Sequence, residues 1–547
     1  MRQYEMAELC FQGPVPEGSQ VQVNLNAVFA KDGKSTKVKG FYAGEGRYKV
    51  RFLPEEAGEY TYEVSGIVSG SGSLQIEPAD EKHHGPVRAD GIFLKYADGT
   101  RHSSFGTTVY ALAHQSEALM NETFETLAKS PFNKVRMCLF PKHYNYNHNN
   151  PRYYAFAPSE AGKGNTYEAE EGSQVAGSSF ADVSINNWDV HHPDFRFWEA
   201  FEDKILRLQE LGIECDLILF HPYDRWGFAS MPQADNLVYL DYLLRRFSAF
   251  PNVWWSLANE YDLCTAKSLS DWEEIEAFVA VNDPVHHMLS NHNCFQPWDW
   301  SRENVTHISW QTKQFARVGE LARKYQKPVL FDECRYEGNV PESWGNISGK
   351  DMTSRFWKVM TQGGYCTHGE TFYPGTEIAK ENTATGESEV VWWARGGRLH
   401  GESPARIAFL REIVESLPGP LHPGASLMSS MLGLTDEQAE ALLQQVPGDY
   451  RRFLSCLVAM EATERDKFIM AEPEYAGQVG EDEAFLSYKD TQCCAKASMM
   501  LPETSTYRVD VIDTWNMTRE TVLTGVSGRV EVDLPGREYM AILAVKE

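Results

Sequence analysis

The sequence has no long apolar run and comparatively few positive charges. No stretch of about 18 apolar residues occurs, so the sequence predicts no membrane-spanning helix. Its 51 Lys and Arg residues are outnumbered by 77 Asp and Glu residues, which gives a formal charge of −26. Such a charge opposes binding to phosphate backbones and anionic lipid headgroups. We therefore expect no nucleic-acid partner and no membrane partner, whereas a homo-oligomer is compatible with this composition.

The sequence also lacks the signals of export, disulfide frameworks and metal sites. Residues 1–6 lead into a polar run, without the charged start and apolar core of a signal peptide, so we expect a cytoplasmic protein. No Cys-x-x-Cys motif occurs. The histidines of the pairs 83–84, 191–192 and 286–287 are adjacent in sequence, so the two members of a pair cannot both bind the same metal ion. We expect no metal and no cofactor. Free core thiols are favoured because six cysteines fall in or beside predicted buried strands, namely Cys138, Cys215, Cys264, Cys294, Cys334 and Cys366.

Both ends of the chain alternate between apolar and polar residues with a period of two. In the first 80 residues, such runs occur at 21–27 and 48–52, and turn signals such as Asp32-Gly33 separate them. The same alternation returns at 507–511 and 530–534. Short alternating runs joined by tight turns are typical of antiparallel β-sandwiches.

From about residue 88 to 420, short apolar runs alternate with helical segments, as at 197–211 and 315–325, which indicates a parallel sheet. The expected strands are 104–111, 134–140, 214–220, 253–258, 287–290, 306–310, 328–331 and 365–371. Eight strands close a (β/α)₈, or TIM, barrel. A long insertion at roughly 145–187 follows the second strand and is expected to lie over the barrel mouth.

These patterns predict a multidomain chain with a central (β/α)₈ barrel flanked by two antiparallel β-sandwiches. A capping box from Thr435 to Gln438 marks a helical segment before the last domain. The predicted regions are an N-terminal β-sandwich at 1–82, the catalytic barrel at 83–422, a helical segment at 423–475 and a C-terminal β-sandwich at 476–547.

Two of the predicted barrel strands are followed directly by a carboxylate. The fourth strand leads into Asn259 and Glu260, and the seventh leads into Asp332 and Glu333. Residues after barrel strands usually carry catalysis, and retaining glycosidases need one protonated and one charged carboxyl group. Either glutamate alone could instead cap a helix or form an ion pair. Together they predict a retaining glycoside hydrolase with Glu260 as acid/base and Glu333 as nucleophile; the alternative is a non-catalytic carbohydrate-binding protein on the same barrel.

The sequence around these glutamates resembles clan A of the glycoside hydrolases. More specifically, the segments 331–338 and 367–372 look like the DUF-type barrel hydrolases related to bacterial apiosidases, and 105–108 and 220–227 agree. The two flanking sandwiches are similar to accessory domains that often accompany such barrels. This resemblance implies a carbohydrate substrate, such as an oligosaccharide or a polysaccharide side chain.

The resemblance also implies roles for individual residues. Asn259 would hydrogen-bond the sugar 2-hydroxyl, although it could also cap a helix. Arg136 on the second strand would lie beneath Glu333 and keep it ionised, or it could form a structural ion pair. Relatives often place a Tyr against the nucleophile from strand six, where this chain has His307 and Trp310. The partner that orients the nucleophile therefore stays open.

Further residues near strand ends complete the candidate substrate-binding set. Aromatic faces stack on sugar C–H groups and histidines bind hydroxyls, although each residue could equally be part of ordinary packing. The aromatic candidates are Tyr223, Trp226, Trp310, Tyr336, Trp392 and Trp393, and the polar candidates are His143, His221, His292 and Glu370. Glu370, a third carboxylate, would bind a hydroxyl or compete for the acid role. Asp262 and Glu337 are expected in ion pairs or loop hydrogen bonds.

Overall fold

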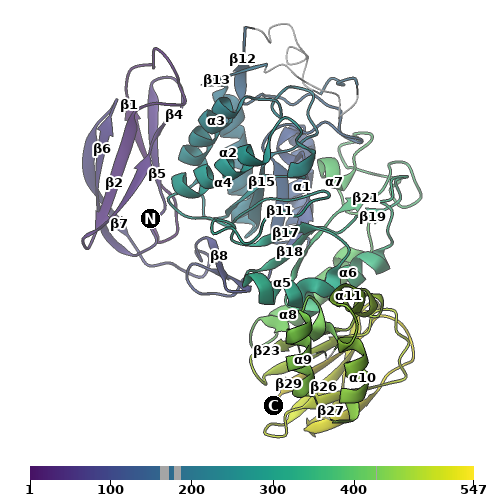
Figure 1. Ribbon diagram of the computed structural model, residues 1–547. Helices are drawn as coiled ribbons and strands as arrows, with labels where there is room; N and C mark the ends of the chain where they lie inside the picture. Colours follow the sequence, from purple (N-terminus) through teal and green to yellow (C-terminus); the bar gives the residue numbers. More distant parts are fainter. Residues whose placement is uncertain (161–171, 178–186, 425, 427, 447) are drawn as a thin grey trace. The chain divides into compact units, whose positions relative to one another are not determined.

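The chain forms two compact units in the computed structural model (Figure 1). The first unit comprises residues 1–89, 94–311 and 369–400, and the second comprises residues 90–93, 312–368 and 401–547. None of the helices in the described part of the chain is long and apolar enough to cross a membrane. The structure describes residues 1–160, 172–177, 187–424, 426, 428–446 and 448–547.

The first unit begins with a β-sandwich of two antiparallel sheets, ordered β1-β5-β4 and β3-β2-β6-β7 (Figure 1). Its strands are β1 (Ala7–Gln12), β2 (Leu25–Lys31), β3 (Lys34–Lys39), β4 (Phe41–Tyr42), β5 (Arg47–Phe52), β6 (Gly58–Gly66) and β7 (Gly70–Ile76). In β2, Leu25 and Ala27 are buried whereas Asn26 between them is exposed, which is the predicted period of two. Phe29 of β2 stacks on Phe52 of β5 at 4.2 Å between ring centroids and so joins the two sheets. The predicted N-terminal sandwich is confirmed.

A parallel sheet of eight strands follows, with the order β16-β15-β14-β11-β10-β20-β18-β17. The strands are β10 (Phe105–Thr108), β11 (Lys134–Cys138), β14 (Glu214–Phe220), β15 (Val253–Ala258), β16 (Leu289–Ser290), β17 (Ile308–Gln311), β18 (Val329–Glu333) and β20 (Tyr365–His368). Hydrogen bonds also join the two edges: Thr306 N–H donates to Leu289 O at 2.9 Å, and Ser290 Oγ donates to His307 O at 2.8 Å. The sheet is therefore a nearly closed barrel, as predicted.

Helices alternate with most of the barrel strands. They are α1 (Glu117–Leu127), α2 (Phe195–Glu210), α3 (Gln233–Phe247), α4 (Leu269–Asn282), α5 (Val318–Tyr325), α6 (Gly349–Thr361), α7 (Trp392–Arg395) and α8 (Ser403–Glu415). In α2, Phe197, Phe201 and Ile205 recur at helical spacing and are all buried. This helix begins after Asp194, whose carboxylate caps the N–H of Arg196. Because these apolar residues recur at helical spacing, the ends of this helix could be predicted from the sequence to within two residues.

A buried charge cluster connects the sandwich to the barrel within the first unit. Arg51 of β5 makes two hydrogen bonds to the Glu202 carboxylate on α2, at 2.8 and 2.9 Å. Arg246 of α3 binds the same carboxylate at 2.6 Å. Burial alone would raise the pKa of Glu202, but the two guanidinium groups hold it below its ordinary value. One domain therefore supplies a counter-charge for the other.

Short strands extend from the barrel. These are β8 (Val87–Asp90), β9 (Phe93–Tyr96), β12 (Phe156–Pro158), β13 (Trp188–Pro193), β19 (Glu337–Gly338) and β21 (Glu370–Thr371). Strand β12 lies inside the long insertion predicted at 145–187 and pairs antiparallel with β13, which follows that insertion. Because residues 161–171 and 178–186 of this insertion lie outside the described residues, its place over the barrel mouth stays a prediction.

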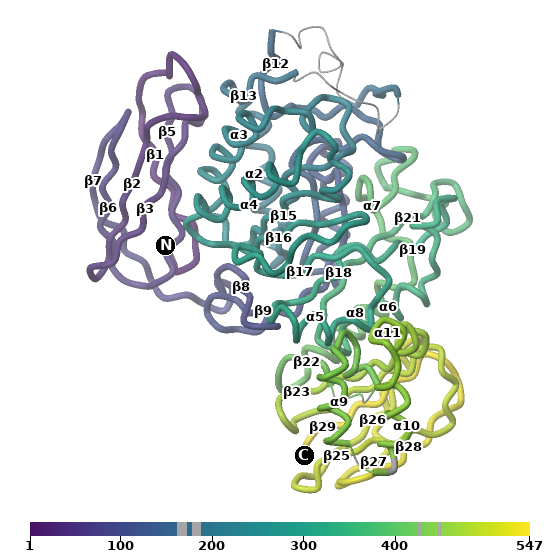
Figure 2. The backbone as a smooth tube through the Cα atoms, viewed as in Figure 1, coloured from purple at the N-terminus to yellow at the C-terminus, as the bar shows by residue number. Residues whose placement is uncertain are grey.

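The second unit ends in a helical segment and a second all-β domain. The helices are α9 (Asp436–Gln444), α10 (Gly448–Val458) and α11 (Ala462–Ala471), and the strands are β22 (Leu421–Pro423), β23 (Tyr475–Val479), β24 (Ala484–Tyr488), β25 (Lys496–Leu501), β26 (Tyr507–Asp513), β27 (Thr518–Val526), β28 (Gly528–Asp533) and β29 (Met540–Lys546). Figure 2 traces these strands to the C-terminus. Thr435 and Gln438 form the predicted capping box of α9. The sheets β22-β23-β24-β29-β26-β27 and β25-β28 enclose a core that includes Val509 and Val532, which confirms the C-terminal sandwich.

The cysteines bear out the expectation of free thiols. All ten are free, and of the six expected in the core, Cys294 is half-buried and the other five are buried. Sulfur therefore contributes to this fold as apolar packing volume.

Candidate active site

Glu260 lies directly after β15 in a left-handed backbone conformation, with φ 54° and ψ 59°. Its carboxylate accepts hydrogen bonds from the hydroxyl of Tyr223 and from the side-chain amides of Asn259 at 3.2 Å and Gln311 at 3.3 Å. Its backbone N–H donates to Nδ1 of His292 at 3.4 Å. Such a backbone conformation is uncommon outside glycine and is typical of functional sites. The carboxyl group is thus only 6% exposed and fixed by several donors at a strand end.

Asn259 is held at both ends of its amide. The hydroxyl of Tyr110, in the loop after β10, donates to Asn259 Oδ1 at 2.8 Å. Since this oxygen accepts from Tyr110, the NH₂ group is the end that faces Glu260. The amide therefore does not cap a helix, and its orientation suits donation to a hydroxyl.

Glu333, in the second unit, is the last residue of β18. The hydroxyl of Tyr336 donates a hydrogen bond to Glu333 Oε1. Tyr336 is itself fixed, because its N–H donates to Trp344 O at 2.8 Å and its carbonyl accepts from Ile347 N–H at 3.2 Å. Relatives often place a tyrosine against this glutamate from strand six. In this structure the tyrosine comes from the loop after strand seven.

Arg136 lies fully buried on β11, the second strand of the barrel. Its guanidinium donates to Asp216 at 3.0 Å, and the ammonium of Lys134 binds the same carboxylate at 3.1 Å. The structural ion pair that the sequence left open is therefore present. A further role of Arg136 beneath Glu333 stays a prediction.

The three candidate histidines, His143, His221 and His292, are buried, and the first two bind backbone carbonyl groups. His143 Nε2 lies 2.8 Å from Val175 O, and His221 Nε2 lies 3.2 Å from Phe140 O. Burial, together with the charge of Lys142, lowers the pKa of His221 to about 3. His221 is therefore neutral at physiological pH and suited to hydrogen bonding without charge.

Three of the candidate indoles pack inside the barrel domain. Trp226 is fully buried and donates to Asn150 Oδ1 at 3.0 Å. Trp392 is also buried and donates to Thr107 Oγ1 at 3.0 Å. Trp310 is 8% exposed. These positions match the ordinary packing that the sequence left open for each, and contact with a sugar stays a prediction.

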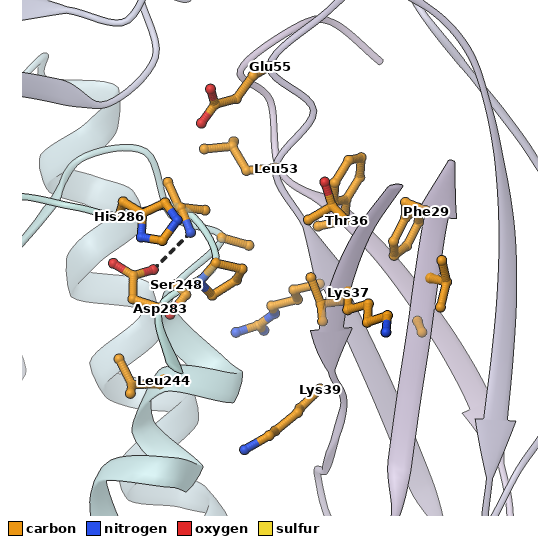
Figure 3. Close-up of a pocket in the computed structure, with 18 of the residues that line it drawn as sticks. Phe29, Thr36, Lys37, Lys39, Leu53, Glu55, Leu244, Ser248, Asp283 and His286 are labelled. Atoms are coloured by element: carbon orange, nitrogen blue, oxygen red, sulfur yellow. Dashed lines mark hydrogen bonds between the residues drawn. The ribbon is translucent and has the colours of Figure 1, made fainter. Parts of the chain in front are cut away.

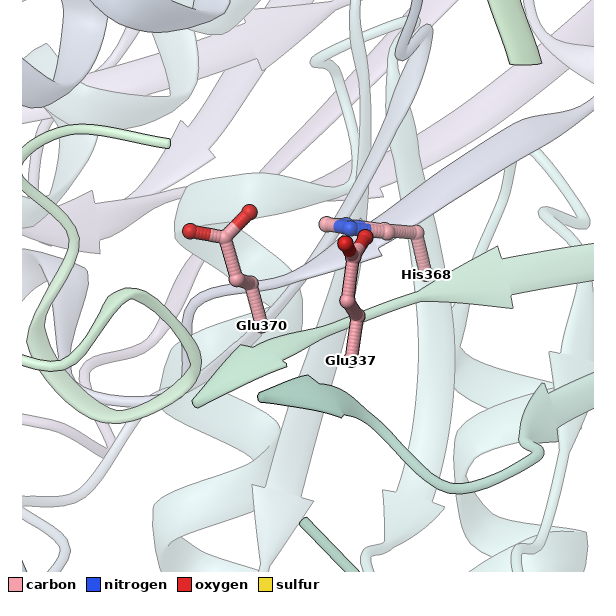
Figure 4. A group of neighbouring side chains, drawn as sticks. All are labelled: Glu337, His368 and Glu370. Atoms are coloured by element: carbon pink, nitrogen blue, oxygen red, sulfur yellow. The ribbon is translucent and has the colours of Figure 1, made fainter. Parts of the chain in front are cut away.

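Glu337 and Glu370 both accept hydrogen bonds from backbone N–H groups. Figure 4 draws these two side chains together with that of His368. The carboxylate of Glu337 accepts from the N–H groups of Glu402 at 2.7 Å and Ser403 at 3.1 Å, and so it caps the start of α8. The expected loop hydrogen bonds of Glu337 are thus confirmed. A potential metal-ligand atom of His368 lies within 4.8 Å of one on Glu337, but both oxygens of Glu337 already accept hydrogen bonds from the N–H groups at the start of α8. Burial lowers the pKa of His368 to about 3, so its imidazole is neutral at physiological pH. Glu370 accepts from the N–H of His400.

Asp262, two residues after Glu260, holds the loop that follows β16. Its carboxylate accepts the backbone N–H groups of Cys294 at 2.7 Å, Phe295 at 2.7 Å and Gln296 at 2.8 Å. The expected loop hydrogen bonds are again confirmed. Because its oxygens are committed to these amides, Asp262 serves structure next to the candidate acid/base.

A cavity of about 1080 Å³ lies elsewhere in the first unit, beside β3 and the ends of α3 and α4. Figure 3 shows Lys37 and Lys39 of β3 on one side of it and Leu244 and Asp283 on the other. Lys39 pairs with Asp241 at 2.8 Å, so part of its charge is already neutralised. The candidate catalytic residues do not line this cavity, and we do not place the active site there.

Three residues around Glu260 were not predicted from the sequence. Tyr110 lies two residues beyond β10, Gln311 ends β17, and Lys142 follows β11. The same attention to strand ends that found Glu260 would have found Tyr110 and Gln311. Lys142 carries no such signal, because a lysine in a loop usually faces solvent.

Comparisons with known proteins find family matches along most of the chain. Residues 88–418 match the family described as "Apiosidase-like, catalytic domain". Residues 1–66 and 473–544 match two domains of unknown function, DUF5060 and DUF5605. None of the curated proteins matches the chain.

Two solved structures illustrate the likeness. A crystal structure of a proposed glycoside hydrolase from Bacteroides vulgatus ATCC 8482 is 30% identical, covers 100% of this chain and 99% of its own, and has a TM-score of 0.80. A glycoside hydrolase family 5 protein from the same organism is 14% identical over 85% of this chain and 93% of its own, with a TM-score of 0.55, which is a likeness of fold alone. Because the family match spans more than half of its length, the chain belongs to the apiosidase-like catalytic domain family.

Proposed function

We propose that this protein is a retaining glycoside hydrolase that acts on oligosaccharides or on side chains of polysaccharides. One observation carries the proposal. Glu260 and Glu333 each lie at the end of a different strand of a parallel barrel, and each accepts a hydrogen bond from a tyrosine hydroxyl. Strand ends on this face are where barrel enzymes place their catalytic groups. The family match and the likeness to a proposed glycoside hydrolase support the same chemistry.

The proposed reaction has two displacement steps. In the first, Glu333 attacks the anomeric carbon while Glu260 gives its proton to the departing glycosidic oxygen, which leaves a glycosyl ester on Glu333. In the second, the Glu260 carboxylate takes a proton from water as that water attacks the same carbon, and the ester bond breaks. The sugar leaves with its original configuration and both glutamates return to their starting states.

Neighbouring side chains support these roles. Tyr336 holds one oxygen of Glu333, which directs the carboxylate for attack. Asn259 presents its NH₂ group beside Glu260, where it would donate to the sugar 2-hydroxyl, a contact that strengthens in the transition state. Tyr223 donates to Glu260 and so fixes the carboxyl that must exchange protons.

A panel of aryl glycosides and plant oligosaccharides tests the proposal. Aryl apiosides belong in the panel because of the family's description. We expect the wild type to hydrolyse at least one substrate and both Glu260→Ala and Glu333→Ala to lose about 10³-fold or more in kcat. Glu303→Ala, a change at an exposed glutamate, is the control and should keep full activity.

Stereochemistry and azide rescue separate the two glutamates. NMR of early product should show the anomer of the substrate, and azide should rescue Glu333→Ala by forming a glycosyl azide of inverted configuration. Undiminished hydrolysis by Glu333→Ala would reject the nucleophile, and an inverted wild-type product would reject retention. Sugar binding without any hydrolysis would instead identify a carbohydrate-binding protein.

A further inference from the structure

Lys142 is a buried cation that the proposed reaction does not use. It follows β11 and is only 3% exposed. Its Nζ lies 3.5 Å from the ring centroid of Tyr110 and 4.2 Å from that of Tyr223. The rings of Trp393 and Tyr144 lie at 5.1 and 5.7 Å. Four aromatic rings therefore lie within about 6 Å of one ammonium group. At such distances the quadrupole of an aromatic ring attracts a cation.

The rings around Lys142 also contact one another. Tyr144 meets Tyr223 at 4.6 Å and Trp393 at 5.6 Å between ring centroids, in edge-to-face arrangements. Tyr110 meets Trp393 at 5.7 Å in the same manner. Edge-to-face pairs at these distances are favourable, so the cluster is a continuous packed group inside the first unit.

Two of these rings lead directly to the candidate acid/base. The hydroxyl of Tyr223 donates to Glu260, and the hydroxyl of Tyr110 donates to Asn259 at 2.8 Å. A cation on the face of a phenol ring draws electron density from it, which makes the phenol a stronger hydrogen-bond donor. Lys142 is thus the shared neighbour of the two tyrosines that fix Glu260 and Asn259.

We propose that Lys142 is a positioning residue, which holds the carboxyl group of Glu260 through Tyr223 and the amide of Asn259 through Tyr110. Its effect on catalysis rests on the proposed glycosidase function, whereas its effect on the two hydrogen bonds can be measured without any substrate. The alternative, an ammonium group that binds an acidic sugar, would require access for the sugar, and at 3% exposure the rings occupy that space.

Crystal structures of Lys142→Met test the geometry, because methionine keeps the length of the side chain and removes the charge. Lys267→Met is the matched control: Lys267 is 8% exposed and its Nζ lies 4.7 Å from the Phe220 ring. We expect Tyr223 to move away from Glu260, or Tyr110 from Asn259, in Lys142→Met alone. Both hydrogen bonds intact in Lys142→Met would overturn the proposal, as would the same movement in the control.

Kinetics test the consequence. Because a displacement of about 1 Å can cost about 100-fold, we expect Lys142→Met to lower kcat by about 10- to 100-fold with KM nearly unchanged, and Lys142→Arg to restore most of that loss. With Tyr223→Phe, the double variant should lose less than the two single variants combined, since the hydrogen bond from Tyr223 to Glu260 is one of the two on which Lys142 acts. Additive losses would overturn the proposal, and so would a loss confined to acidic substrates through KM.

Two further outcomes remain decisive. If the wild type hydrolyses nothing, the proposed function fails while the crystal structures still decide the role of Lys142. If Lys142→Met does not fold, Lys142→Arg decides it: a retained charge should keep both hydrogen bonds and a kcat within about 5-fold of wild type, since charge and ring contact persist. Loss of both hydrogen bonds or of activity in a folded Lys142→Arg variant would overturn the proposal.

Discussion

The hydroxyl of Tyr336 donates a hydrogen bond to Glu333, three residues before it in the chain. Arg335 between them takes a left-handed conformation, with φ 71°, which turns the chain back toward the strand end. Glu333 and the tyrosine that orients it thus belong to one short segment, so the conformation of that segment alone determines how the two side chains lie relative to each other.

Tyr336→Phe tests this relationship. Removing the hydroxyl leaves one oxygen of Glu333 without its donor, and we expect kcat to fall by about 10- to 100-fold with a smaller change in KM. The lost hydrogen bond favoured the charged carboxylate, so the acid limb of the kcat/KM profile should move to higher pH. A pH profile measured on the best substrate checks both effects. An unchanged profile in a folded variant would remove Tyr336 from the mechanism.

Asp262→Ala tests the loop that follows β16. The substitution removes the acceptor of three backbone N–H groups, and we expect the free energy of unfolding to fall by about 2 to 4 kcal/mol. Urea denaturation measures the loss, and hydrogen exchange should be faster at residues 294–296. Asp299→Ala, which removes a cap on the exposed residue Ser301, is the control and should cost less. Equal exchange in the two variants would contradict this role.

Glu202→Gln tests the charge cluster between sandwich and barrel. The neighbouring guanidinium groups lower the pKa of Glu202, so its stabilising effect is present above the unfolded-state pKa of about 4.3 and is lost as pH falls through the folded-state value. We expect the variant to lose about 3 to 5 kcal/mol at pH 7 and the difference to shrink below about pH 4. Denaturation curves at both pH values check this. A difference independent of pH would show that packing, not charge, is responsible.

Glu214→Gln should change the stability in the opposite direction to Glu202→Gln, by stabilising the protein at high pH. Burial raises the pKa of Glu214, which accepts a hydrogen bond from Trp254 at 2.9 Å, to about 8. The unfolded chain releases this proton near pH 4.3, so stability falls as pH rises from about 4.3 to about 8. The amide avoids this cost, and we expect the variant to be about 2 to 5 kcal/mol more stable at pH 8 but equal to wild type near pH 4. Lower stability at pH 8 would refute the shift.

The barrel strands could be predicted because a strand buried on both faces must be a nearly continuous apolar run. Strands β14 and β15 match their predicted ranges to the residue. Strand β16 has two residues where four were expected, because hydrogen-bonded pairing with a neighbour, not apolar character, sets where a strand ends.

The partners of the candidate residues could not be predicted in the same way. Tyr336 was a candidate either for contact with a sugar or for ordinary packing. The hydrogen bond from its hydroxyl to Glu333 depends on the turn at Arg335 and was not predicted. Arg136 binds Asp216, 80 positions later in the chain. Which charged side chain meets which inside the barrel depends on strand register, and strands that are buried on both faces show no apolar–polar alternation that would indicate their register.

The cluster around Glu202 has a practical consequence for anyone who shortens this protein. A truncated chain that starts at the barrel would keep Glu202 and Arg246 but would lose Arg51, which supplies two of the hydrogen bonds to that carboxylate. The helix surface beneath the missing sandwich would then expose an under-neutralised acid and freshly bared apolar rings to water. We therefore expect a stably folded fragment of this protein to include the N-terminal sandwich.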